Sequence, residues 1–96
     1  MSNFYDCWAP PGIWGPWVDI MSVMGPTTEK LSFKTQSNAK SSFSVEVEYF
    51  GSQWENDIVA IPGSGSFQFK VGPAISTVRV RCKSHSLGQT VRVEEN

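Results

Sequence analysis

The sequence predicts an all-β protein: a single antiparallel β-sandwich, jelly-roll or immunoglobulin-like, with about seven to eight short strands and an extended Trp/Pro-rich N-terminal arm. Apolar residues occupy every second position over most of residues 66–94, and successive side chains of a strand point to opposite faces. Gly, Pro and Ser separate such stretches at intervals of about 8–12 residues. The sequence shows no helical period. Because parallel strands need crossover connections that are usually helical, the strands are expected to be antiparallel.

Residues 66–94 are expected to form the last three strands. Their inward-facing residues are Phe67, Phe69, Val71, Val78, Val80, Cys82, Val91 and Val93. The other register carries polar and charged side chains, which indicates one buried face and one wet face. Gly72-Pro73 and Ser86-Leu87-Gly88 separate these strands as turns.

Four more strands are expected at residues 17–24, 28–36, 42–50 and 54–61, with a polar loop over 37–42. The third of these strands has the clearest pattern. Its inward row is Phe43, Val45, Val47 and Tyr49, and its outward row is Ser44, Glu46 and Glu48. The fourth fits two registers, with either Ile58 and Ala60 or Val59 and Ile61 inward.

Residues 1–16 differ in composition from the sandwich domain predicted over residues 17–96. Pro10-Pro11 and Gly15-Pro16 exclude a helix, because proline lacks an N–H and forces the preceding residue into extended geometry. The same segment is rich in aromatic rings, which must be buried somewhere. We therefore predict an extended arm that packs either on its own domain or on another chain.

Size and charge narrow the classes of function. The 96 residues suit one domain. A net charge of −1 provides no basic excess for nucleic acid, and no apolar run is long enough to span a bilayer. The first residues lack the basic and apolar regions of a signal peptide, so we expect a cytoplasmic protein or one exported by a leaderless route. Peripheral contact with a membrane stays compatible with this composition.

The two cysteines, Cys7 and Cys82, leave three alternatives open. Both can stay reduced, as is usual in the cytosol. They can pair, which would close a loop of about 75 residues and stabilise the fold by about 4 kcal/mol in the chain-entropy model. Cys7 can instead bond a neighbouring subunit.

Catalysis finds little support. The single histidine, His85, is expected in an exposed turn, and the flanking Ser84 and Ser86 would point elsewhere in an extended chain. The acidic stretch Glu55-Asn56-Asp57 offers too few oxygen ligands for Ca²⁺ and suits a turn better. We predict a protein that is not an enzyme and that needs neither metal nor cofactor.

The candidate ligand or interface residues are aromatic side chains outside the strand period. They are Phe4, Tyr5, Trp8, Trp14, Trp17 and Trp54. Such rings often cap the open end of a sandwich, but they also serve as platforms for sugars or as anchors in interfaces. A stripe of Arg79, Arg81 and Lys83 is a candidate anion contact, although Glu46 and Glu48 offer it cross-strand ion pairs instead.

Three functional hypotheses follow. The first is a non-enzymatic assembly subunit that self-associates or docks on a protein partner through the aromatic arm. The alternative is a carbohydrate-binding, lectin-like module with Trp54, Trp14 or Trp17 as platforms. A further alternative is a membrane-interacting toxin or toxin partner whose arm inserts into the bilayer interface.

Overall fold

The computed structural model describes residues 3–36 and 42–95, so residues 37–41 of the loop predicted over 37–42 lie outside the described residues. These residues form eight strands and no helix, which confirms the predicted all-β sandwich. The strands are β1 (Asn3–Ala9), β2 (Val18–Met24), β3 (Thr27–Thr35), β4 (Phe43–Phe50), β5 (Trp54–Ile61), β6 (Ser64–Val71), β7 (Ile75–Ser84) and β8 (Gln89–Glu95).

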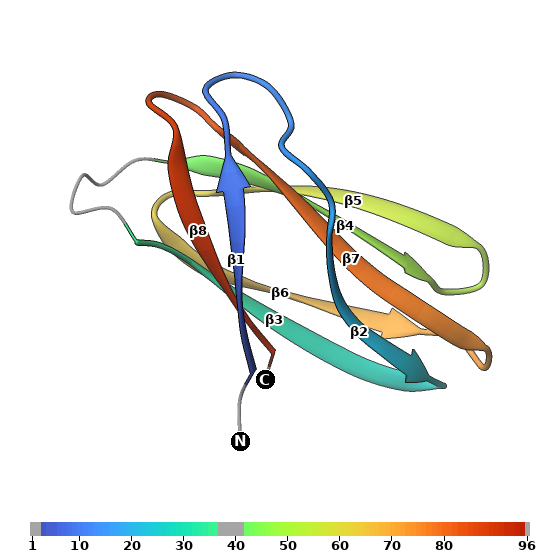
Figure 1. The fold of residues 1–96 in the computed structure, drawn as a ribbon. Helices are drawn as coiled ribbons and strands as arrows, with labels where there is room; N and C mark the ends of the chain where they lie inside the picture. The colour runs from blue at the N-terminus through green and yellow to red at the C-terminus, as the bar shows by residue number, and fades with distance from the viewer. Residues whose placement is uncertain (1–2, 37–41, 96) are drawn as a thin grey trace.

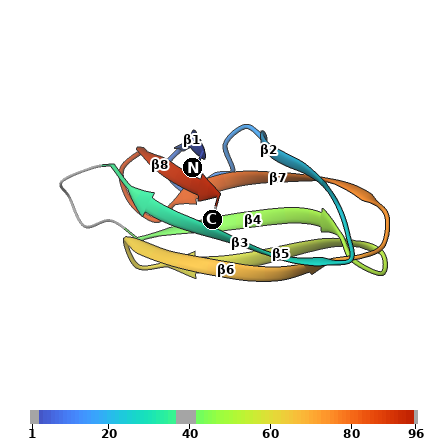
Figure 2. The same cartoon turned by 90° about the horizontal axis from the view of Figure 1, so that it is seen from below.

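Two four-stranded antiparallel sheets make up the sandwich (Figure 1). Sheet A has the order β1-β8-β3-β6, and sheet B has the order β2-β7-β4-β5. The chain changes sheet at every connection except the β4–β5 hairpin, which is the arrangement of a jelly roll. The molecule is flattened, measuring 40 × 28 × 18 Å (Figure 2).

The core is made by the inward rows that the alternation predicts. Fully buried side chains include Leu31, Phe33, Phe43, Val45, Val47, Val78, Val80, Cys82, Val91 and Val93. In β5 the structure decides between the two registers: Ile61 is buried, whereas Ile58 is 63% exposed. Strand positions therefore follow from the period of two, because each sheet has one face against the other sheet.

The predicted arm is not confirmed, because Asn3–Ala9 forms edge strand β1 and pairs with β8 from Asn3↔Glu95 to Ala9↔Gln89. Cys7 and Ala9 are fully buried, while Phe4, Asp6 and Trp8 face outward. This is a period of two, but its two fully buried residues are small. The prolines come only after the strand has ended.

The rest of the predicted arm, residues 10–16, runs along β7. The N–H of Gly12 donates to the carbonyl of Ser84, and the N–H of Gly15 donates to the carbonyl of Cys82, both at 2.9 Å. The N–H of Ser84 in turn donates to the carbonyl of Pro10 at 2.9 Å. This loop therefore packs on its own domain.

The sequence predicts the register of β4 correctly, but two residues that it assigns to the solvent-exposed face are buried. Ser44 and Glu46 are only 8% and 7% exposed. The carboxylate of Glu46 accepts hydrogen bonds from Arg81 and Asn56, and the hydroxyl of Ser44 bonds His85. Long neighbouring side chains thus cover a face that alternation alone assigns to solvent.

Replacing Phe43 with Ala should lower the free energy of unfolding by about 3–5 kcal/mol, because it leaves a cavity beneath a fully buried ring. The matched control is Leu87→Ala, at a side chain that is 81% exposed, which should change stability by less than about 0.5 kcal/mol. Urea denaturation measures both. Equal effects at the two positions would contradict the assigned core.

Candidate functional site

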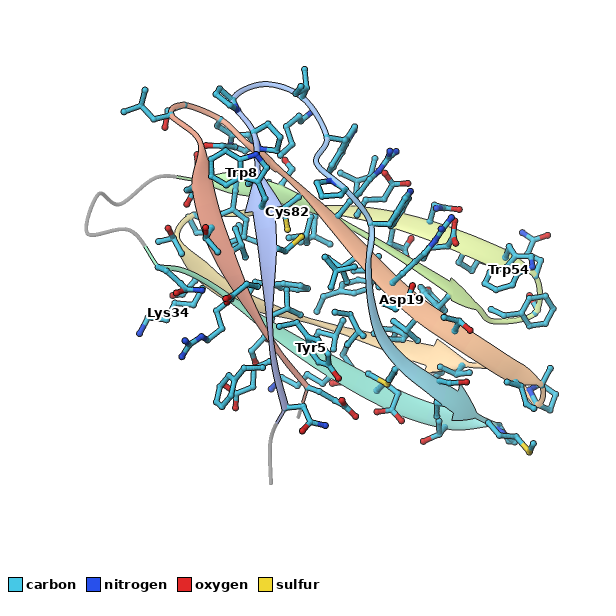
Figure 3. All side chains as sticks on the ribbon, in the orientation of Figure 1. Tyr5, Trp8, Asp19, Lys34, Trp54 and Cys82 are labelled. Atoms are coloured by element: carbon cyan, nitrogen blue, oxygen red, sulfur yellow. The ribbon has the colours of Figure 1, made fainter. Side chains whose placement is uncertain are left out.

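The structure separates the six aromatic residues that the sequence singles out. Phe4 and Trp8 project from the outer face of sheet A, and Tyr5 points toward the core. Trp14 and Trp17 contact side chains on the outer face of sheet B. Trp54 lies in another part of the molecule from Trp8, beside Phe50 (Figure 3). The candidates therefore do not form one site.

The outer face of sheet B is an ion-pair network. Arg79 Nε lies 2.6 Å from Glu48 Oε1, and one terminal nitrogen of Arg81 lies 2.7 Å from Glu46 Oε1. Asn56 Nδ2 donates to both carboxylates at 3.1 Å, which links the two pairs. The cross-strand registers Glu46↔Arg81 and Glu48↔Arg79 place these partners side by side.

The indole rings of Trp14 and Trp17 contact the predicted basic stripe. The guanidinium carbon of Arg79 lies 4.3 Å from the centre of the Trp17 ring, and that of Arg81 lies 4.6 Å from it. Lys83 Nζ lies 4.8 Å from the Trp14 ring. These cation–π contacts occupy both rings within the same chain. Binding of an anion by Arg79, Arg81 and Lys83 stays a prediction. The two arginines already form ion pairs with Glu48 and Glu46.

The outer face of sheet A has a different character, because it is hollowed. One pocket of about 320 Å³ lies over β3, β6 and β8. Its lining residues are Phe4, Ser32, Phe33, Lys34, Ser64, Gly65, Arg92 and Glu94. The guanidinium carbon of Arg92 lies 5.0 Å from the centre of the Phe4 ring, so this aromatic ring is supported by a cation. Phe4 remains 54% exposed.

A second pocket of about 430 Å³ lies beside Trp8 and Gly88. Asp6, Gln36, Gln89 and Thr90 complete its lining. Gln36 Nε2 donates to Asp6 Oδ1 at 2.6 Å, which fixes an amide and a carboxylate next to each other. Gly88 lies against the Trp8 ring, since a Cβ at residue 88 would come within 2.6 Å of that ring. Trp8 is 48% exposed.

The two pockets have neighbouring lining residues on the outer face of sheet A, and together they are here called the sheet A groove. Asp6 in the second pocket lies directly opposite Arg92 in the first, and Arg92 lies opposite Lys34. Figure 3 shows Trp8 on β1 and Lys34 two strands away on β3. Phe4 and Trp8 are four strand residues apart, or about 13 Å. The groove thus has an exposed aromatic ring toward each end and polar groups between them.

His85 makes a further polar contact on the sandwich. Its Nδ1 lies 2.8 Å from Ser42 Oγ, and its Nε2 lies 2.7 Å from Ser44 Oγ. In a Ser-His-Asp triad the second ring nitrogen faces a carboxylate, whereas here it faces a second serine. The residue lines neither pocket of the sheet A groove. In the described part of the chain, no group of three or more His, Cys, Asp or Glu side chains is arranged to hold a metal ion.

Sequence reasoning missed most of the groove. Asp6, Lys34, Gln36, Arg92 and Glu94 were not candidates, because they look like ordinary solvent-facing residues in separate strands. The signal that could have found them is the alternation in residues 3–9, which makes this segment a strand. Strand pairing brings four of them together, and Gln36 joins them just beyond β3, where its N–H donates to the carbonyl of Thr90.

Comparison with known proteins supports the fold alone. No protein-family model and no curated protein matches this chain. One solved structure, titled "Crystal structure of PirA", is similar with a TM-score of 0.54 and 7% sequence identity. The similarity covers 96% of this chain and 91% of that chain. Among the described residues, no helix is long and apolar enough to cross a membrane.

Acidification should weaken the sheet B network. The hydrogen bond from Arg79 holds the pKa of Glu48 below its ordinary value of 4.5, against the opposing effect of burial. Because the folded-state pKa is depressed, this stabilisation is present above pH 4.5 and is lost as the pH falls through the folded-state value. Glu48→Gln should therefore reduce stability slightly at pH 7 and make no difference at low pH. Urea midpoints at both pH values measure this.

The matched control is the same substitution in an Arg79→Gln background, where the main charged partner of Glu48 is already gone and Glu48→Gln should lose most of this pH dependence. A destabilisation by Glu48→Gln that is the same at pH 7 and at low pH would contradict the role assigned to the ion pair.

Proposed function

We propose that the protein is a non-enzymatic binding module and that the sheet A groove binds a carbohydrate. The observation that carries this proposal is the pairing of two exposed aromatic rings, Trp8 and Phe4, with a polar groove that connects them. Jelly rolls serve many functions, so the argument depends on the groove and not on the fold.

The aromatic rings suit the apolar faces of sugar rings. A sugar presents C–H groups on its faces, and a flat aromatic ring buries them over a large area. Trp8 lies against Gly88, and Phe4 lies beside the guanidinium group of Arg92. Rings that are already supported lose little conformational freedom when a ligand binds, which favours affinity.

The polar groups between the rings suit sugar hydroxyls, each of which both donates and accepts hydrogen bonds. The carboxylates of Asp6 and Glu94 accept, while Lys34 and Arg92 donate. Hydrogen bonds from a hydroxyl to a charged side chain are stronger than neutral ones. Specificity then depends on which hydroxyls reach these groups.

The charge of the groove favours a neutral ligand. It contains two cations, Lys34 and Arg92, and two carboxylates, Asp6 and Glu94, so neither sign dominates. An anionic or cationic ligand would meet a like charge beside each opposite one. The separation of about 13 Å between Phe4 and Trp8 gives room for more than one sugar ring. We therefore expect an uncharged oligosaccharide.

The aromatic rings proposed to stack on sugars are Trp8 and Phe4, and not Trp14, Trp17 or Trp54 as the sequence predicts. Trp14 and Trp17 each contact two cations of the basic stripe and are less exposed than Phe4 and Trp8, which leaves less of each ring for a ligand. The same contacts leave less of the predicted arm to insert into a membrane. Trp8 and Phe4 remain half-exposed and belong to one groove.

Self-association is a second candidate function, and the position of β1 favours it. Among the described residues, β1 has a hydrogen-bonded neighbour strand on one side only, namely β8. An open edge can accept a strand from another chain. Assembly would then use a strand fixed in the sandwich and not a loose arm. Deleting residues 1–16 would not test assembly cleanly, because it removes β1 from sheet A.

Trp8→Ala should weaken binding to an oligosaccharide by at least about tenfold, since it removes one stacking platform. The matched control is Trp54→Ala, at a ring that is 56% exposed but distant from the groove, and it should bind normally. A glycan array identifies the oligosaccharide, and isothermal titration calorimetry measures the affinities. Circular dichroism melting verifies that both variants fold.

Two outcomes would contradict this account of function. An array without a bound glycan at high protein concentration would exclude carbohydrate binding. Equal losses of affinity in the two variants would place the site elsewhere. Light scattering on the same samples tests the second candidate, because strand addition at β1 predicts a mass that rises with concentration.

A further inference from the structure

Strands β1 and β7 bring the two sheets unusually close together. They belong to different sheets, yet their Cα atoms approach within 8 Å at more positions than those of any other pair of strands from opposite sheets. Stacked sheets usually lie about 10 Å apart. The side chains between them are small and fully buried: Cys7 and Ala9 on β1, and Cys82 and Ser84 on β7. Figure 1 shows β1 passing beside β7 at this corner.

The thiols of Cys7 and Cys82 face each other in this space. Cys7 Sγ lies 4.0 Å from the carbonyl oxygen of Val80, two residues before Cys82 on β7, and each thiol is close enough to shift the pKa of the other. In a disulfide the two Cα atoms lie about 4.4–6.8 Å apart, a separation that strands this close can provide. Both cysteines are free thiols in this structure.

We propose that Cys7 and Cys82 form a disulfide that cross-links sheet A to sheet B when the protein meets a disulfide oxidant. The proposal depends on the facing thiols and on the close approach of the strands that carry them. It does not depend on the ligand proposed for the sheet A groove.

The reaction is thiol–disulfide exchange with a small-molecule disulfide such as oxidised glutathione. The Cys7 thiol loses its proton, and its sulfur attacks the oxidant to form a mixed disulfide while one small thiol leaves. Cys82 then loses its proton, and its sulfur attacks Cys7 Sγ, which releases the second small thiol. The two cysteines are oxidised and the oxidant is reduced to two thiols. The proximity of the two thiols supports this order, because it lowers the pKa of Cys7, against burial, and raises that of Cys82.

Access to the buried thiols comes through the edge of sheet A. β1 pairs with one strand only, and edge strands open locally at a lower free energy than the core. The oxidant can also act before β1 pairs during folding. Once formed, the bond would hold β1 against sheet B, together with the outward-facing Phe4, Asp6 and Trp8 of the groove.

The test is to refold the full chain in a buffer of reduced and oxidised glutathione, quench exchange with acid, and then block free thiols with iodoacetamide in denaturant, which exposes the buried cysteines. Intact mass spectrometry should show monomer that has lost the mass of two hydrogens and carries no added group. A non-reducing digest should contain one peptide pair linking Cys7 and Cys82. Two alkylated thiols, a stable glutathione adduct or a disulfide-linked dimer would each overturn the proposal.

Thermal melting gives an independent readout. The oxidised wild type should melt at least about 10 °C above its reduced form, because the bond closes a long loop. Cys7→Ser and Cys82→Ser should melt at one temperature with or without reductant. An oxidised wild type that melts no higher than its reduced form would contradict a native cross-link. The mass measurement on the wild type decides the matter even where a variant fails to fold.

Discussion

The pairing of β1 with β8 is the interaction on which the rest of the structure depends. Its ladder runs from Asn3↔Glu95 to Ala9↔Gln89 and adds the fourth strand to sheet A. It buries Cys7 and Ala9 against β7 and leaves Phe4, Asp6 and Trp8 outside. Without it, the sheet A groove would lose one wall, and Cys7 would have no counterpart across the core.

The two faces of the sandwich differ in how their charged groups are arranged. On sheet B, Arg79 and Arg81 have carboxylate partners and lie over the rings of Trp14 and Trp17. On sheet A, aromatic and charged side chains surround the two pockets of the groove. A face whose groups are paired internally has less to offer a ligand. This contrast is why sheet A is assigned the binding role.

The period of two predicted seven of the eight strands, because burial of one face leaves a direct trace in the order of residues. It did not predict β1, whose inward residues Cys7 and Ala9 are small and whose neighbourhood is dominated by Trp and Pro. The same period wrongly predicted that Glu46 is exposed to solvent. Arg81 and Asn56 cover this side chain, and which strands lie beside β4 does not follow from the period. The groove could not be predicted for the same reason: its strand residues come together through the pairing of β1 with β8, β8 with β3 and β3 with β6.

Chemical-shift mapping tests the central claim, that the sheet A groove is the binding face, most directly. Backbone amides of ¹⁵N-labelled protein would be titrated with the strongest oligosaccharide from the array. The account predicts that the perturbed amides gather around Phe4, Asp6, Trp8, Lys34 and Arg92. Perturbations centred on Trp14, Trp17 and Arg81 of the sheet B face would contradict it.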